Sequence, residues 1–253
     1  MVMVMDGATR PPPRGLLAAT WRSAPTGASR RDPTQRDPLA PKTHPGPTSL
    51  RSRWALLLLT FVLGSAALGI TLNLEPGHAA FVPGTLAMAT IWALGARACG
   101  PPAWIGPGGW PRQALLGAAA GSVALGMCLL VGAALAGVEA LAEPVAAQLA
   151  HRGPTAVPVL VALTALNGVA EETYFRGSLY KALPARTAWL VSAAIYALAT
   201  LPAGIALLTA GAAFLGGITG LLRRVSGGLL APTTAHLIWS VGMLLLLPTV
   251  MES

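Results

Sequence analysis

The chain has 253 residues, of which 54% are hydrophobic and only 10% are charged. Soluble domains carry about 25% charged residues, so this composition excludes an ordinary soluble globular protein. Long apolar runs separated by Pro, Gly and Arg predict an all-α, polytopic membrane bundle, and short alternating segments typical of membrane β-barrels are not evident.

The N-terminal segment, residues 1–50, is rich in Pro, Arg, Thr and Ser. Residues 1–53 hold nine Lys and Arg against three Asp, so most of the net charge of +8 lies there. This composition cannot bury apolar area and predicts a disordered basic tail. A basic segment beside a membrane helix can contact anionic lipid. No basic helix or aromatic platform accompanies it, which argues against a nucleic-acid partner.

Seven apolar segments follow, each near the length of about 20 residues that a membrane-spanning helix needs. We expect two N-terminal transmembrane helices within residues 51–110 and a membrane domain over residues 111–250. The fifth and sixth segments are separated only by Leu-Pro-Ala-Gly, which predicts a tight helical hairpin or one broken unit. The segments comprise residues 54–74, 79–96, 113–137, 155–172, 187–203, 205–222 and 228–248.

Basic residues alternate between the predicted connections. Cytoplasmic loops of membrane proteins carry an excess of Lys and Arg, so the side that collects them predicts the orientation. If the N-terminus is cytoplasmic, the opposite side holds Arg152 as its one basic residue, together with four Glu. We therefore expect an integral protein of the plasma membrane with a cytoplasmic N-terminus. The cytoplasmic side then holds Arg51, Arg53, Arg97, Arg112, Arg176, Lys181, Arg186, Arg223 and Arg224.

Two adjacent glutamates, Glu171 and Glu172, end the fourth apolar segment. Arg176 follows Glu172 by four residues, a spacing at which two side chains meet on one helix face. Glu171 points about 100° away around the helix, so it can face the bundle interior while Glu172 pairs with Arg176. An ionisable residue inside a membrane bundle indicates a functional site; a structural ion pair at the helix end is the alternative.

A histidine, His236, lies within the seventh segment and is the only histidine inside a predicted span. A membrane histidine can simply hydrogen-bond to a neighbouring helix. A glutamate and a histidine on different helices can also bind a metal or activate a water molecule. Packing of the fourth helix against the seventh would bring Glu171 and His236 to a shared polar cavity.

Three stretches carry a resemblance to a known family: "EETYFRG" (171–177), "FLGGITGLLRR" (214–224) and "GGLLAPTTAHLIWS" (227–240). In this order they resemble the CPBP family of CAAX proteases and bacteriocin-processing enzymes, also called Abi or type II CAAX prenyl endopeptidase-like proteins. The resemblance covers about residues 110–248. It implies a CPBP-like membrane domain that hydrolyses a peptide bond of a peptide or protein substrate.

The resemblance also implies roles for individual residues. Glu171 would be the general base, Glu172 and Arg176 would brace its helix, and His236 would stabilise the oxyanion. Glu171 and His236 are also the candidate ligands of a divalent metal such as zinc.

The sequence departs from the family pattern at two positions. The family usually has Phe-x-x-x-His after the glutamate motif, where this chain has Tyr196 and Thr200. The family's final motif usually ends in Asn or Asp, where this chain has Ser240. Thr200 and Ser240 are expected to line the site.

Two other functions stay open. Loss of a His and an Asn together is the pattern expected of a family member that no longer catalyses and acts as a membrane binding or immunity-type protein. A small transporter is the third candidate, although the few intramembrane charges and the lack of an evident inverted repeat argue against it. The substrate is not identified by the sequence.

Overall fold

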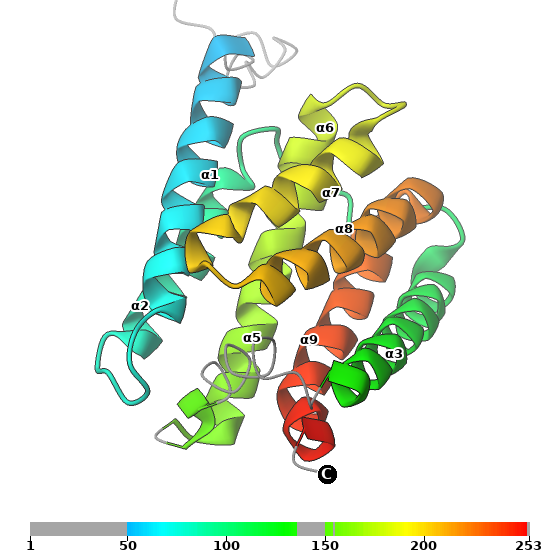
Figure 1. Cartoon of the computed structure of the whole chain (residues 1–253). Coiled ribbons are helices and arrows are strands. Elements are labelled where there is room, and N and C mark those ends of the chain that lie inside the picture. Colours follow the sequence, from blue (N-terminus) through cyan, green and yellow to red (C-terminus); the bar gives the residue numbers. More distant parts are fainter. Residues whose placement is uncertain (1–49, 136–149, 154, 252–253) are drawn as a thin grey trace, which may run out of the picture. The chain divides into compact units, whose positions relative to one another are not determined.

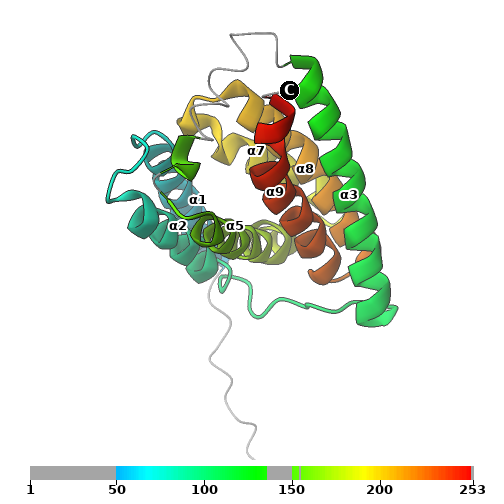
Figure 2. The same ribbon diagram turned by 90° about the horizontal axis from the view of Figure 1, so that it is seen from below.

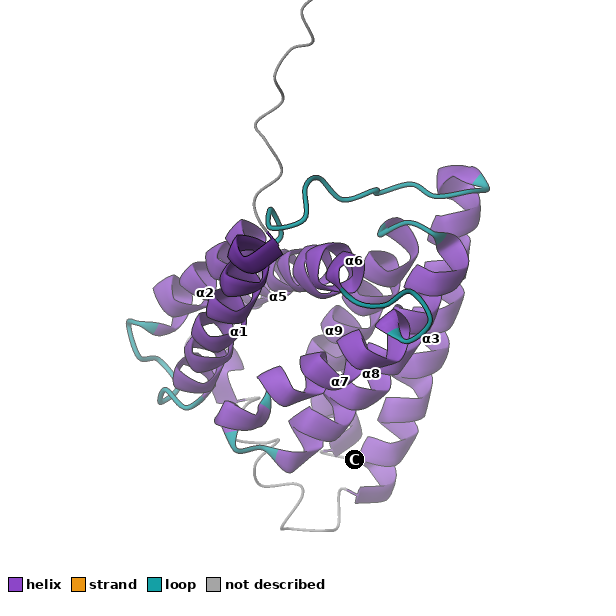
Figure 3. Ribbon diagram, turned by 90° about the horizontal axis from the view of Figure 1, so that it is seen from above, coloured by secondary structure: helices purple, strands orange, loops and turns teal. Residues whose placement is uncertain are grey.

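The computed structural model describes residues 50–135, 150–153 and 155–251, and within these residues it contains helices and loops but no strand (Figure 1, Figure 3). The all-α expectation is confirmed. The predicted tail, except for Leu50, lies outside the described residues. The elements are α1 (Leu50–Leu72), α2 (Phe81–Gly95), α3 (Gly109–Leu135), η1 (Ala150–Arg152), α5 (Val157–Glu172), η2 (Thr173–Leu179), α6 (Tyr180–Ala182), α7 (Ala188–Ala199), η3 (Leu201–Ala203), α8 (Ala206–Ser226) and α9 (Leu230–Met251).

Each of the seven predicted segments coincides with one helix to within a few residues. Four helices of the described chain are long and apolar enough to cross a membrane: Leu50–Leu72, Gly109–Ala134, Ala206–Ser226 and Leu230–Val250. α2 and the α7–η3 segment are shorter apolar helices. The predicted hairpin is present between α7 and α8. Its turn uses the left-handed backbone of Gly204, with φ of 72°, which a glycine adopts without strain.

The end of the fourth segment differs from the prediction. The helical backbone does not stop at Glu172 but continues through the π-helix η2 and the short helix α6 as far as Ala182. Hydropathy does not reveal this continuation because residues 173–182 mix polar, charged and aromatic side chains. All but the first residue of η2 are buried, so tertiary contacts stabilise a segment that is not uniformly apolar.

α5 is the central helix of the described bundle. It packs against α2 on one side and α9 on the other, and α9 also packs against α3 and α8 (Figure 2). Small residues permit these close approaches between helices. A Cβ added at Gly121 would lie 2.7 Å from the Ala235 carbonyl oxygen, so α3 and α9 are nearly in backbone contact there.

The connections around the N-terminal end of α9 lie together. The Leu229 amide donates a hydrogen bond of 3.0 Å to the Ala103 carbonyl, and Lys181 Nζ donates one of 2.7 Å to the Pro101 carbonyl. The connections α2–α3, α6–α7 and α8–α9 therefore meet at one end of the bundle. These are three of the loops that the sequence assigns to one side of the membrane.

The remaining described connections lie together as a second group. Asn73 Nδ2 donates a hydrogen bond of 3.2 Å to the Ala203 carbonyl, which joins the α1–α2 and α7–α8 turns. The rings of Phe81 and His151 stack at 4.2 Å between centroids, which adds the segment before α5. This grouping agrees with the predicted alternation of the helices.

Candidate functional site

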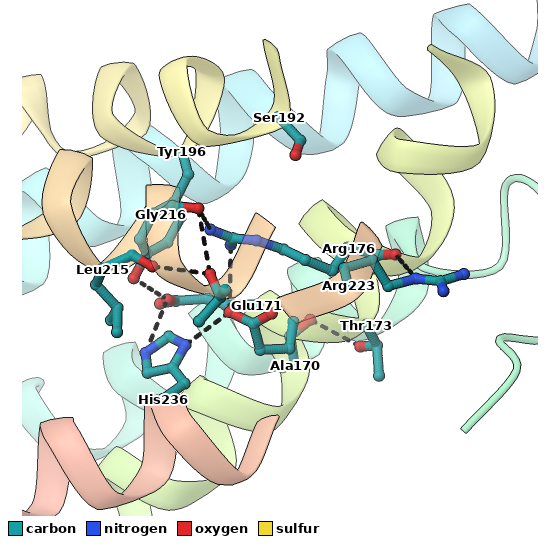
Figure 4. Close-up of polar contacts among 12 residues, drawn as sticks. Ala170, Glu171, Thr173, Arg176, Ser192, Tyr196, Leu215, Gly216, Arg223 and His236 are labelled. Atoms are coloured by element: carbon teal, nitrogen blue, oxygen red, sulfur yellow. Dashed lines mark hydrogen bonds and ion pairs between the residues drawn. The ribbon is translucent and has the colours of Figure 1, made fainter. Parts of the chain in front are cut away.

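Both glutamates are buried at the C-terminal end of α5, although they are neighbours in the chain. Glu172 is 0% exposed and Glu171 is 8% exposed. His236 from α9 and Arg176 from η2 are also buried, at 4% and 0% exposure. Figure 4 shows Glu171, Arg176 and His236 converging from separate elements. The predicted meeting of α5 and α9 at Glu171 and His236 is therefore present.

Glu172 binds two basic side chains through one oxygen. Its Oε1 lies 3.2 Å from Arg176 Nη1, so the ion pair predicted from the four-residue spacing is present. The same oxygen lies 2.9 Å from His236 Nδ1. The sequence predicts that Glu172 pairs with Arg176 and that His236 faces Glu171. In the structure, however, the carboxylate closest to His236 is that of Glu172. Because a carboxylate only accepts hydrogen bonds, His236 Nδ1 is the donor in this contact.

Glu171 has different partners. Its Oε2 accepts a hydrogen bond of 2.9 Å from the Tyr196 hydroxyl and lies 3.9 Å from His236 Nε2. The second distance is too long for a direct hydrogen bond, and two polar atoms at such a separation commonly share a water molecule. Glu171 is also the more exposed of the two glutamates. Of the two carboxylates, only Glu171 therefore has accessible surface.

Arg176 is held from several directions. Its Nη2 donates a hydrogen bond of 3.1 Å to the Gly216 carbonyl of α8, and its guanidinium lies 4.7 Å from the centre of the Tyr196 ring. A Cβ at Gly216 would lie 3.3 Å from Nη2. The glycine-rich motif of α8 thus lets a backbone carbonyl approach a buried guanidinium. Glu171, Glu172, Arg176, Tyr196 and His236 are called the buried cluster below.

The π-helix η2 is stabilised by Arg223. In a π-helix the backbone bonds shift to i→i+5 spacing, and such turns often occur at functional sites. Arg223 Nε donates a hydrogen bond of 2.9 Å to the Arg176 carbonyl, and its guanidinium lies 5.3 Å from the centre of the Tyr180 ring. The basic end of the "FLGGITGLLRR" stretch therefore supports the segment that carries Arg176.

Thr200 and Ser240 are not part of this hydrogen-bond network. Thr200 donates a hydrogen bond of 2.8 Å to the Ala197 carbonyl and lies 3.0 Å from the Thr209 hydroxyl. Ser240 is half-buried on α9, one turn after His236. The polar atom that α7 directs at Glu171 comes instead from Tyr196, one turn before Thr200.

Tyr196 is not identified as a site residue from the sequence, because the family pattern gives Tyr196 only as a substitute for Phe. A signal was available. A buried Tyr hydroxyl usually finds a hydrogen-bond partner, and residues 188–199 are otherwise apolar except for Ser192. The partner of the Tyr196 hydroxyl is therefore expected on another helix. Carboxylates are rare in the apolar segments, so Glu171 and Glu172 are natural candidates.

An open groove of about 670 Å³ lies on another face of α5. Its lining includes Leu166, Val169 and Ala170 of α5 together with residues of α2 and the following loop, but not Glu171 or His236. The groove and the buried cluster therefore occupy different faces of one helix.

The donors available to a divalent metal are few. In the described residues no group of three or more His, Cys, Asp or Glu side chains is placed to hold a metal ion. Glu172 Oε1 already contacts Arg176 and His236, and Glu172 Oε2 is buried without a hydrogen-bond partner. Catalytic zinc sites use three protein ligands. Glu171, Glu172 and His236 are not arranged as such a set, so the side chains of the buried cluster do not fit a catalytic zinc ion.

Comparison with protein-family models matches residues 153–242 to the family described as type II CAAX prenyl endopeptidase Rce1-like. The matched residues contain all five members of the buried cluster. No curated protein and no solved structure matches the chain. Over these residues, which are about a third of the chain, the protein is similar to the type II CAAX prenyl endopeptidase Rce1-like family.

Proposed function

We propose that this protein is an intramembrane endopeptidase in which Glu171 activates a water molecule for hydrolysis of a peptide bond. The observation that carries the proposal is the pair formed by Glu171 Oε2 and His236 Nε2, 3.9 Å apart and drawn from different helices. A general base beside a potential oxyanion donor is the minimum that amide hydrolysis requires.

In the proposed reaction, Glu171 takes a proton from water while the water oxygen attacks the carbonyl carbon. The carbonyl π electrons move to oxygen and form a tetrahedral oxyanion. The oxyanion then collapses, the C–N bond breaks, and the leaving nitrogen takes the proton from Glu171. The products are a carboxylic acid and an amine, and Glu171 is again a carboxylate.

His236 is proposed to stabilise the oxyanion. Its Nδ1–H is directed to Glu172, so Nε2 carries a hydrogen only when the ring holds a second proton. Two glutamates and one arginine leave the buried cluster with one net negative charge. A second proton on His236 makes the cluster neutral and gives Nε2 a hydrogen to donate. Glu172 and Arg176 thereby orient the imidazole and do not touch the substrate.

The test is cleavage of a peptide panel, with and without a C-terminal prenyl group, by the purified protein in bilayer discs. Glu171→Gln keeps the shape of the side chain but removes its basicity, and we expect a rate loss of at least about 100-fold. Glu75→Gln, the same change at an exposed position, is the matched control. Equal cleavage by wild type and Glu171→Gln would overturn the proposal.

The proposed reaction is written without a metal ion, because the carboxylates and the imidazole of the buried cluster are not arranged to hold one. Prolonged dialysis against a chelator is therefore expected to leave the cleavage rate unchanged. A loss that zinc restores would place a metal in the reaction.

A second candidate function is that of an inactive binding protein, which the bonding of Thr200 to Thr209 and Ala197 favours. Thr200, at the α7 position where the resemblance places His, then makes no hydrogen bond to Glu171. If wild type is inert and Thr200→His with Ser240→Asn gains cleavage, this second function is correct.

We also propose that the protein lies in the plasma membrane with a cytoplasmic N-terminus. The basic residues of the α2–α3, α6–α7 and α8–α9 connections support this orientation. Single cysteines at exposed Glu75 and Arg186 report the two loop groups in a background without native cysteines. Membrane-impermeant reagent is expected to label position 75 from outside intact cells and position 186 only after lysis. Labelling of both from one side would contradict the topology.

A further inference from the structure

The ring of Tyr196 is surrounded by Phe175, Arg176 and His236. The ring lies edge-on to Phe175 at 4.9 Å and to His236 at 6.0 Å between centroids. The guanidinium of Arg176 covers one face at 4.7 Å from the centroid. With contacts to an aromatic, a cation and an imidazole, the ring has little freedom to turn, and its hydroxyl has a fixed direction.

That direction ends at Glu171. The hydroxyl donates to Glu171 Oε2 at 2.9 Å, across 25 positions of the chain. A carboxylate bound at one oxygen cannot rotate freely, so Oε2 keeps its direction toward His236 Nε2, 3.9 Å away. From these contacts we infer that Tyr196 is a positioning residue, which holds the general base so that Oε2 stays directed at the water between Glu171 and His236. The inference rests on the proposed hydrolytic function.

The role belongs to a phenol and not to an aromatic ring alone. Phenylalanine would fill the same space and keep the ring contacts with Phe175 and Arg176. It would leave Glu171 without its only side-chain hydrogen bond among the described residues. A misplacement of a catalytic group by about 1 Å can cost about 100-fold in rate. The effect of Tyr196→Phe should therefore be on catalysis more than on folding.

Tyr174 provides a matched control. Its hydroxyl is also buried and donates a hydrogen bond of 2.6 Å, but to the Leu57 carbonyl of α1. Tyr174→Phe removes the same atom from the same kind of environment without touching Glu171. Any general effect of deleting a buried phenol oxygen should appear equally in both variants.

The experiment compares cleavage by wild type, Tyr196→Phe and Tyr174→Phe in bilayer discs. We expect Tyr196→Phe to lower kcat about 100-fold with KM nearly unchanged. The acidic limb of its pH–rate profile should move to higher pH, because the phenol favours the ionised carboxylate. Tyr174→Phe should keep the wild-type kcat and profile. Equal kcat values and equal profiles for wild type and Tyr196→Phe would overturn the inference.

A second readout does not need cleavage. Dicyclohexylcarbodiimide modifies protonated carboxyl groups, and mass spectrometry of the peptide containing Glu171 measures the rate. Tyr196→Phe should be modified several times faster than wild type, and Tyr174→Phe should not. If wild type cleaves nothing, the proposed function fails, and the carbodiimide rates still decide the inference: equal rates for wild type and Tyr196→Phe would overturn it.

Discussion

Two groups of buried polar side chains in the described bundle differ in where their partners come from. In the first group the partner is four residues earlier on the same helix. The hydroxyls of Thr85 and Thr219 donate to the carbonyls of Phe81 and Leu215 at 2.7 and 3.0 Å. Thr85 and Thr219 are called the local polar set.

In the buried cluster one pair, Glu172 and Arg176, is four residues apart, and the other partners lie on different helices. Glu171 and Glu172 come from α5, Arg176 from η2, Tyr196 from α7 and His236 from α9. A helix can satisfy the local polar set by itself, so such residues indicate nothing about function. The buried cluster forms only when separate helices meet, and its charges lose their hydration. Folding does not require such an arrangement, since replacing a buried ion pair by apolar residues of similar volume often leaves stability unchanged or raises it. This contrast, together with the charges of the buried cluster, is the reason that we propose the buried cluster as the functional feature.

The largest expected effect on stability comes from breaking the buried cluster at Arg176. Arg176→Ala leaves Glu172 buried at 0% exposure without its arginine. Removing one partner of a buried ion pair costs about 3–5 kcal/mol. Arg186→Ala changes an exposed arginine and should cost less than about 0.5 kcal/mol.

Thermal unfolding of both variants in matched detergent measures the difference. An unchanged unfolding midpoint in Arg176→Ala would show that the ion pair contributes little. The buried cluster would then resemble the local polar set energetically.

A smaller effect is expected at the helix contact that frames the buried cluster. A Cβ at Gly220 would collide with the Trp189 carbonyl oxygen of α7, whereas a Cβ at Gly217 meets nothing within 4 Å. Gly220→Ala should therefore separate α7 from α8 and destabilise the fold by about 1–3 kcal/mol. Gly217→Ala should be neutral or stabilise by up to about 1 kcal/mol, because alanine favours the helix. Equal unfolding midpoints for the two variants would show that α7 and α8 tolerate a wider spacing.

The sequence predicts the helices of this bundle well because each is a long apolar run between Pro, Gly and Arg. It does not predict the helical continuation over residues 173–182, because that segment depends on distant partners. Arg176 bonds to the Gly216 carbonyl and Ser178 to the Ala96 carbonyl. Neither contact has a signature in local hydropathy.

The sequence also identifies four members of the buried cluster, because ionisable residues within apolar segments are rare. It does not establish their pairing. The choice between Glu171 and Glu172 as the closer partner of His236 depends on how α9 is rotated about its axis, which composition does not determine. Thr200 was assigned by resemblance, and its hydroxyl bonds elsewhere. Tyr196 lies one turn away on the same helix and makes the contact with Glu171.

The smallest effect is expected in the local polar set. It tests whether a side chain of this set contributes less to stability than one of the buried cluster. Thr85→Val keeps the β-branched shape and removes the hydroxyl together with its bond to the Phe81 carbonyl. That carbonyl lies within α2 and also accepts the helical hydrogen bond from the Thr85 amide, so it is not left without a donor. A typical net contribution of such a bond is about 1 kcal/mol, and the valine gains in apolar burial what the hydroxyl loses. We therefore expect a change in the free energy of unfolding below about 1 kcal/mol and an unchanged cleavage rate.

Thermal unfolding of Thr85→Val and Arg176→Ala in the same detergent compares the two groups directly. If Thr85→Val destabilises the protein as much as Arg176→Ala does, a polar residue bonded within its own helix matters as much as one bound across helices. The distinction between the two groups then fails.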